Sequence, residues 1–153
     1  MDYIVKQKIN NWMQMSFEAV SENEGLARIA VASFVTALNP TMEELADIKT
    51  AVSEAVTNSI IHGYEEEKGT IVLRCRLRGD LLEVEVEDQG KGIADIDQAM
   101  EPLFTSKPEK DRSGMGFSFM EAFMDDLEVS SVLGMGTLVK MKKKLGTISW
   151  LEL

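Results

Sequence analysis

The stretch IVLRCRLRGDLLEVEVED, residues 71–88, decides the fold. Apolar and polar residues alternate on both sides of Gly79-Asp80, a dipeptide typical of a two-residue hairpin loop. Counting outward from that loop pairs Ile71 with Asp88. The pattern therefore predicts two antiparallel strands with one apolar and one charged face, and it turns Asp88 inward where the chain leaves the sheet.

The segment before this hairpin predicts a strand followed by a helix. Apolar and polar residues alternate over residues 13–19, as in a half-buried strand. Ser21 and Glu24 have the spacing of a capping box, and apolar residues then recur at helical spacing up to Asn39-Pro40. We expect the first helix between these points.

A second and longer helix follows directly. Thr41 and Glu44 repeat the capping-box spacing, and an apolar stripe continues from there. The stripe ends at Gly63, a residue suited to a C-terminal cap. This helix is expected to be the central element of the helical layer.

The remainder of the chain predicts a loop, a helix and a closing hairpin. Periodicity fades over residues 89–116, where a short helix near residues 95–100 is expected. A loop of that length is usually functional, and an active-site lid is a frequent case. Helical spacing resumes at Phe117, and residues 127–132 and 137–143 form the last two predicted strands.

These elements predict an α+β fold in a single domain, residues 1–153. With 44% hydrophobic residues in 153, the chain can bury one sizeable core but is short for two domains. The element order favours a two-layer α/β sandwich in which helices cover one mixed sheet, with a mobile lid.

Composition excludes several classes of partner. The net charge of -10 disfavours direct binding to nucleic acid, since phosphates would be repelled. Cys75 has no second cysteine with which to form a disulfide. The sequence offers neither a leader pattern nor the ~18 apolar residues of a membrane span. We therefore expect a cytoplasmic protein.

Polar residues spaced by four lie beside the apolar stripe of the second helix. Glu54, Asn58 and His62 share one helix face. A carboxylate and an amide one turn apart can act as a general base and as a ligand of Mg²⁺. The spacing is common, however, and by itself fits a solvated helix face. His62 fits a hydrogen-bonded helix end as well as a nucleotide contact.

Glycine-rich segments supply two further signals. Asp88, Gly90 and Gly92 follow a strand, where an inward carboxylate would accept a hydrogen bond from a purine amino group and the glycines would allow close approach of a ligand. Alone, this pattern fits a capped turn better. Another glycine pair precedes a helix N-terminus, which can hold phosphate oxygens, in the segment Gly114, Met115, Gly116. Neither a P-loop nor a Rossmann sequence is present.

The order of these signals, ending in the GMGT segment at residues 134–137, resembles the GHKL ATPase family (gyrase, Hsp90, histidine kinase, MutL). In that family an N box, a G1 box, a lid, a G2 box and a G-x-G-T motif follow in this order. Within the family, the chain is similar to the anti-sigma F branch over residues 15–144. Three segments carry that similarity: SEAVTNSIIHGY (53–64), EPLFTSKPEKDRSGMGF (101–117) and FMEAFMDDLEV (119–129).

The resemblance implies ATP or ADP and Mg²⁺ as ligands and assigns roles to residues. Glu54 becomes the catalytic base, Asn58 the Mg²⁺ ligand, and Asp88 the acid that binds adenine. Arg28 on the first helix becomes a candidate for partner docking. The other implied nucleotide-binding residues are Gly90, Gly92, Thr105, Lys107, Arg112, Gly114, Met115, Gly116, Phe117 and Thr137.

The resemblance further implies a homodimeric serine kinase that regulates sporulation. It would hold a sigma F-like sigma factor inactive and phosphorylate a serine of an anti-anti-sigma protein. Three alternatives remain open: a general-stress kinase with another sigma partner, an ATP-binding switch without catalysis, and the catalytic domain of a histidine kinase. The last would lack its phospho-acceptor helices here. Glu54 favours a kinase over the switch, because nucleotide binding alone needs no base.

Overall fold

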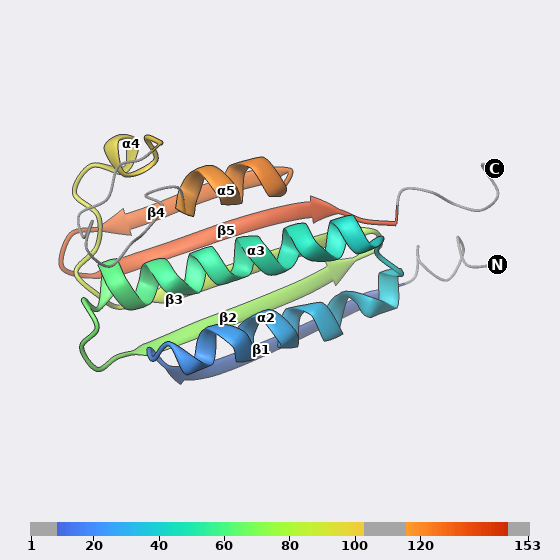
Figure 1. Cartoon of the computed structure of the whole chain (residues 1–153), viewed down its shortest axis with the longest axis horizontal. Helices are drawn as coiled ribbons and strands as arrows, with labels where there is room; N and C mark the ends of the chain where they lie inside the picture. The colour runs from blue at the N-terminus through green and yellow to red at the C-terminus, as the bar shows by residue number, and fades with distance from the viewer. Residues whose placement is uncertain (1–8, 103–115, 147–153) are drawn as a thin grey trace.

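Five antiparallel strands form one sheet in the order β1-β2-β3-β5-β4 (Figure 1). The computed structural model describes residues 9–102 and 116–146. The strands are β1 (Asn10–Glu18), β2 (Thr70–Arg78), β3 (Leu81–Asp88), β4 (Asp126–Val132) and β5 (Gly136–Lys144). The helical elements are α2 (Glu22–Phe34), η1 (Val35–Leu38), α3 (Met42–Asn58), η2 (Ser59–Gly63), α4 (Ile96–Ala99) and α5 (Gly116–Phe123).

The two-layer α+β architecture is confirmed, but the expected mixed sheet is wrong. Each adjacent pair of described strands is antiparallel. After β3 the chain enters the edge strand β4, and a hairpin then returns it as β5 between β4 and β3. Strands β3 and β4 run in the same direction, but β5 separates them, so they are not neighbours. Helices α2, α3 and α5 cover one face of the sheet (Figure 1).

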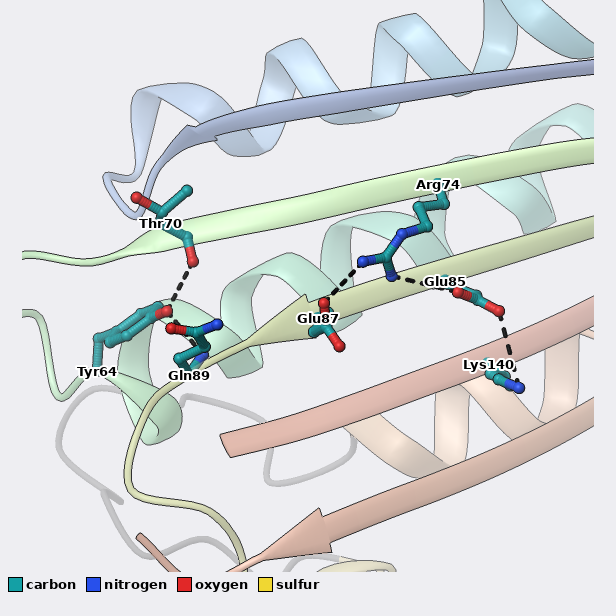
Figure 2. Close-up of polar contacts among 7 residues, drawn as sticks. All are labelled: Tyr64, Thr70, Arg74, Glu85, Glu87, Gln89 and Lys140. Carbon is teal, nitrogen blue, oxygen red and sulfur yellow. Dashed lines mark hydrogen bonds and ion pairs between the residues drawn. The ribbon is translucent and has the colours of Figure 1, made fainter. Parts of the chain in front are cut away.

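The central hairpin has the predicted register, with Ile71 opposite Asp88. Its inward residues are buried and face the helices, while three of its outward residues, Arg74, Glu85 and Glu87, form ion pairs. Arg74 lies 3.3 Å from Glu85 and 2.8 Å from Glu87, and Lys140 of β5 lies 3.8 Å from Glu85 (Figure 2). The inward residues of the hairpin are Ile71, Leu73, Cys75, Leu77, Leu82, Val84 and Val86.

The two predicted capping boxes have different outcomes. At the start of α3, the Glu44 amide donates to Thr41 Oγ1 (3.0 Å) and the Thr41 amide donates to Glu44 Oε1 (2.8 Å), so this box is confirmed. The prediction of a capping box at Ser21 is wrong. The backbone of Ser21 is helical (φ -55°, ψ -34°) and its side chain makes no capping bond, because a capping side chain needs an extended backbone to reach back.

Gly63 is not the left-handed C-cap that its position suggested. Five residues of π-helix, η2, continue α3, and the Tyr64 amide donates to the Ser59 carbonyl at 2.9 Å. Positive φ angles occur instead at Glu65 (53°) and Glu66 (64°). The helix thus changes winding at Ser59 and turns away beyond Gly63. None of the helices in the described ranges has the length and apolar character to cross a membrane.

Candidate functional site

A cavity of about 330 Å³ opens where β3 ends. The end of α3, the start of α5, the loop after β3 and the β4–β5 turn meet there, at the left end of the molecule in Figure 1. Its walls include Asn58, Ser59, His62, Gly63, Asp88, Lys91, Gly92, Ile93, Gln98, Gly116, Phe117, Leu133, Thr137 and Val139. Most of the surface that this lining presents is apolar, as expected of a site that binds an organic ring.

Asp88 is the buried acceptor of this cavity, with 5% of its surface exposed. Ser59 Oγ donates to its Oδ2 at 2.8 Å and the Gly90 amide donates to its Oδ1 at 2.9 Å. Burial raises the pKa of Asp88, and hydrogen bonds from Gly90, Ser59 and the Thr137 backbone act in the opposite direction. Two carboxylate oxygens offer about four acceptor positions. Room therefore remains for a donor from a ligand.

Glycines allow the close packing around Asp88. A Cβ at Gly63 would lie 3.0 Å from the Asp88 carboxyl group, and a Cβ at Gly90 would overlap the Gly63 carbonyl. Gly92 has φ +76°, and a Cβ there would overlap the Val132 carbonyl. Gly90 and Gly92, singled out from the sequence, thus stand where side chains do not fit.

The loop after β3 is held on both sides through Lys91. Its amide donates to the Gly63 carbonyl at 2.9 Å, and its carbonyl accepts from the Gly134 amide at 2.6 Å. The backbone of Lys91 therefore connects η2 with the β4–β5 turn. These bonds fix the floor of the cavity beside Asp88.

Gly116 brings the start of α5 against the polar face of α3. A Cβ at Gly116 would lie 3.0 Å from Asn58 Nδ2 and 3.3 Å from Glu54 Oε2. Glu54 and Asn58 are thus neighbours beside Gly116, as their spacing predicted, although only Asn58 lines the cavity. Phe117 follows Gly116 in the cavity wall and packs on the core.

Thr137 lies at the other side of the cavity, opposite Asp88 in the β3–β5 register. Its Oγ1 is 2.9 Å from Ser131 Oγ, which also accepts from the Ile93 amide at 2.7 Å. The predicted nucleotide-binding residues Asn58, Asp88, Gly92, Gly116, Phe117 and Thr137 therefore line one cavity.

The other residues singled out from the sequence have different positions. Arg28 is on α2, outside the cavity lining, and forms an ion pair of 3.3 Å with Glu24. His62 lines the cavity. Five candidates fall within residues 103–115, outside the described part of the chain: Thr105, Lys107, Arg112, Gly114 and Met115.

The oxygen atoms of the side chains near the end of α3 suit a cation that takes most of its ligands from phosphate and water. Among residues 9–102 and 116–146 no group of three or more His, Cys, Asp or Glu side chains forms a metal cluster. The Asn58 amide and the Glu54 carboxylate offer oxygen atoms instead. Mg²⁺ commonly takes one or two protein oxygens and completes its shell with phosphates and water, so these residues fit it.

Ser59 lines the cavity and is a candidate site residue that the sequence patterns do not single out. It is buried, and its hydroxyl orients Asp88 from 29 positions away in the chain. The available signal was its place directly after Asn58, at the point where the polar face of the helix ends. A small hydroxyl there was not separable from ordinary helix composition.

Known proteins resemble the chain in sequence and in fold. Residues 17–143 match the family described as Histidine kinase-like ATPase domain. The chain is 55% identical to the "Anti-sigma F factor" of Thermoanaerobacter sp. (strain X514) over 137 residues, which is 90% of this chain and 96% of that protein. It is 56% identical to the one from Oceanobacillus iheyensis over 138 residues, 90% of this chain and 94% of that protein.

A solved structure shares the fold. The RsbU and RsbW domains of Rv1364c from Mycobacterium tuberculosis align with a TM-score of 0.64 at 21% identity, over 88% of this chain and 32% of that one. The fold, the profile over residues 17–143 and the identity over nine-tenths of the chain agree. The chain belongs to the histidine kinase-like ATPase family and, within it, to the anti-sigma F factors.

Proposed function

We propose that the chain is an ATP-dependent protein serine kinase that also holds a sigma F-like sigma factor inactive. Its phosphorylation substrate is a serine of an anti-anti-sigma protein, and it acts as a homodimer. One observation carries the proposal. A single cavity is lined by a buried acceptor, Asp88, and by the Asn58 amide, and the Glu54 carboxylate lies next to Asn58 where α3 meets Gly116, outside the cavity lining itself.

Recognition of the base is assigned to Asp88. Its carboxylate retains acceptor capacity after its bonds to Ser59 and Gly90, so it can accept the exocyclic amino group of adenine. A guanine carbonyl at the same point would meet a carboxylate without a donor, which disfavours GTP. The apolar lining suits the faces of the ring.

Phosphoryl transfer is assigned to the α3 end of the cavity. Glu54 accepts the proton of the substrate serine hydroxyl, whose oxygen bonds to the γ-phosphorus while the bond to the β–γ bridging oxygen breaks and ADP leaves. Asn58 would hold Mg²⁺, which supplies neutralisation of phosphate charge. Gly116 and Phe117, at the start of α5, line the cavity, and backbone amides at a helix N-terminus can hold phosphate oxygens.

Sigma binding is proposed from family membership. The relatives are named anti-sigma F factors, and a sigma F-like protein is therefore the partner expected here. A sigma-binding ATP switch without catalysis is the competing function. The position of Glu54 beside Asn58 and Gly116 favours catalysis, since the switch has no need of a base there.

A transfer assay tests the proposal. The full chain is incubated with γ-labelled ATP, Mg²⁺ and candidate anti-anti-sigma proteins, each also as a variant with alanine at the candidate serine. We expect label on one protein and none on its alanine variant. ATP binding and sigma binding without any labelled protein would support the switch instead. Labelling of a protein whose partner sigma factor is not sigma F-like would support the general-stress alternative.

A further inference from the structure

Tyr64 connects the two strands that end beside the cavity. Its hydroxyl donates to the Thr70 carbonyl at 2.6 Å and accepts from the Gln89 amide at 2.8 Å (Figure 2). Thr70 begins β2, and Gln89 follows the last residue of β3. The tyrosine side chain therefore bridges two backbone segments that are 19 positions apart.

The bridge lies one step beyond the end of the β2–β3 ladder. The last pair of that ladder is Ile71 with Asp88, so the next position in register would place Thr70 opposite Gln89. There the Tyr64 hydroxyl takes both the Gln89 amide and the Thr70 carbonyl, the groups that a direct ladder bond would join. Gln89 is thus held at a fixed offset from β2, immediately after Asp88.

Gly69 provides the space for this arrangement. A Cβ at Gly69 would overlap the Tyr64 ring, with Cζ at 2.6 Å. Its φ is not in the left-handed region, so the glycine is required by the ring and not by the backbone conformation. The Gly69 carbonyl accepts from the Ala19 amide at 2.8 Å, which ties this position to the end of β1.

The same helical turn holds Asp88 from its other side. The Ser59 hydroxyl donates to Asp88 Oδ2, and the Tyr64 amide donates to the Ser59 carbonyl. Ser59 therefore fixes the carboxylate, and Tyr64 fixes the peptide that follows it. A displacement of Gln89 would also move Gly90, whose amide donates to Asp88 Oδ1.

We propose that Tyr64 is a positioning residue for adenine recognition. Its hydroxyl holds the peptide after Asp88 so that the carboxylate and the Gly90 amide keep their relative geometry. The inference rests on the adenine contact of Asp88 in the proposed function. A purely structural tyrosine would stabilise the hairpin end without any preference for the base of the nucleotide.

The test compares a nucleotide with a ligand that lacks the base. Dissociation constants for ADP and for inorganic tripolyphosphate, each with Mg²⁺, are measured by calorimetry for the wild type and Tyr64→Phe. The ring is retained in Tyr64→Phe, so the fold should persist. Loss of the hydroxyl should weaken ADP binding roughly 3- to 10-fold and change tripolyphosphate binding by less than about 2-fold. Exchange of the Gln89 amide hydrogen should become faster.

Two further variants make each outcome decisive. Lys140→Gln removes the ion pair with Glu85 on the outer face of the sheet. It should leave the ratio of the affinities for ADP and tripolyphosphate as in the wild type. Asp88→Asn should abolish the preference for ADP. Suppose that Asp88→Asn abolishes the preference for ADP over tripolyphosphate. The role of Tyr64 is then overturned if Tyr64→Phe keeps the wild-type ratio of the two affinities, including the case in which it weakens binding of both ligands equally. If Asp88→Asn leaves the preference intact, the adenine contact and the inference fall together.

Discussion

Ser59 Oγ donates a 2.8 Å hydrogen bond to Asp88 Oδ2 and thereby joins the turn after α3 to the last residue of β3. Both residues are buried. Burial raises the pKa of Asp88, and this bond is one of three that lower it. A hydroxyl from the helical layer thus opposes the effect of burial on the pKa of a carboxylate in the sheet.

Ser59→Ala should weaken ADP binding about tenfold, because a hydrogen bond to a charged group is removed. The pKa of Asp88 should also rise further in this variant. On acidification, its ADP affinity should therefore begin to fall at a higher pH than that of the wild type. Calorimetry between pH 8 and pH 5.5 measures both effects.

Ser53→Ala is the matched control. Ser53 Oγ is buried in the same helix and has no hydrogen-bond partner within the described residues. ADP affinity and its pH dependence should stay as in the wild type. Equal losses in the two serine variants would show that Asp88 is not oriented by Ser59.

Asp88→Asn should reduce ADP affinity by at least about tenfold and change how stability depends on pH. A folded-state pKa above the ordinary 3.8 means that the folded protein binds the proton more tightly than the unfolded chain. That contribution to stability is complete below the ordinary pKa and is lost as pH rises through the raised pKa. Asparagine does not titrate there.

The stability of Asp88→Asn relative to the wild type should therefore be higher at pH 7.5 than at pH 5. Chemical denaturation at both pH values gives the two free energies of unfolding. A relative stability that rises on acidification would contradict burial as the dominant influence on Asp88.

Glu54→Gln should separate catalysis from binding. The amide is nearly isosteric, but it cannot accept the serine proton, so single-turnover transfer should fall by roughly 10² to 10⁴. Affinities for ADP and for the sigma factor should change little. The matched control is Glu121→Gln, at an exposed position of α5. Wild-type transfer by Glu54→Gln would remove the base assignment, and joint loss of both binding activities would make Glu54 structural.

Gly116→Ala should impair nucleotide binding through crowding. The new Cβ would lie 3.0 Å from Asn58 Nδ2 and 3.3 Å from Glu54 Oε2, so these side chains must move. We expect ADP with Mg²⁺ to bind several-fold more weakly than to the wild type. Gly25→Ala is the control, since its Cβ would lie 3.8 Å from Arg28 in a helix and should stabilise the chain by roughly 0.5–1 kcal/mol. Unchanged binding by Gly116→Ala would show that α5 does not restrain the two side chains.

Local sequence patterns predicted the parts of the fold that depend on local geometry. A two-residue loop at Gly79-Asp80 leaves one register for the hairpin, and that register is observed. Thr41 and Ser21 show the limit of such reasoning. Both precede a glutamate by three residues, yet only Thr41 has the extended backbone that a capping side chain requires. That difference arises from how the preceding segment enters the helix.

The remaining errors concern contacts between distant segments. Strand periodicity does not specify which strands become neighbours, so the antiparallel sheet was mistaken for a mixed one. The sequence patterns do not single out Ser59, Tyr64 or Gly69, because tertiary packing determines which residues they contact. A Ser59–Asp88 bond across 29 positions leaves no periodic pattern in the sequence. Glu54 and Asn58, one turn apart on one helix, did leave such a pattern.

The change of winding at Ser59 divides one continuous helix into an α-helical part, α3, and a π-helical part, η2. In α-helix, Glu54 and Asn58 lie one turn apart and face the proposed transfer site. In an α-helix, residues five apart would point about 140° away from each other, whereas the i+5 bond of η2 stacks Tyr64 over Ser59. A one-residue deletion within residues 60–62 should therefore move Tyr64 relative to Ser59, whereas Glu54 and Asn58, which precede the deletion, should keep their spacing. A change of length in η2 should therefore act on the proposed base contact, whereas a change of side chain in α3 should act on the proposed transfer site.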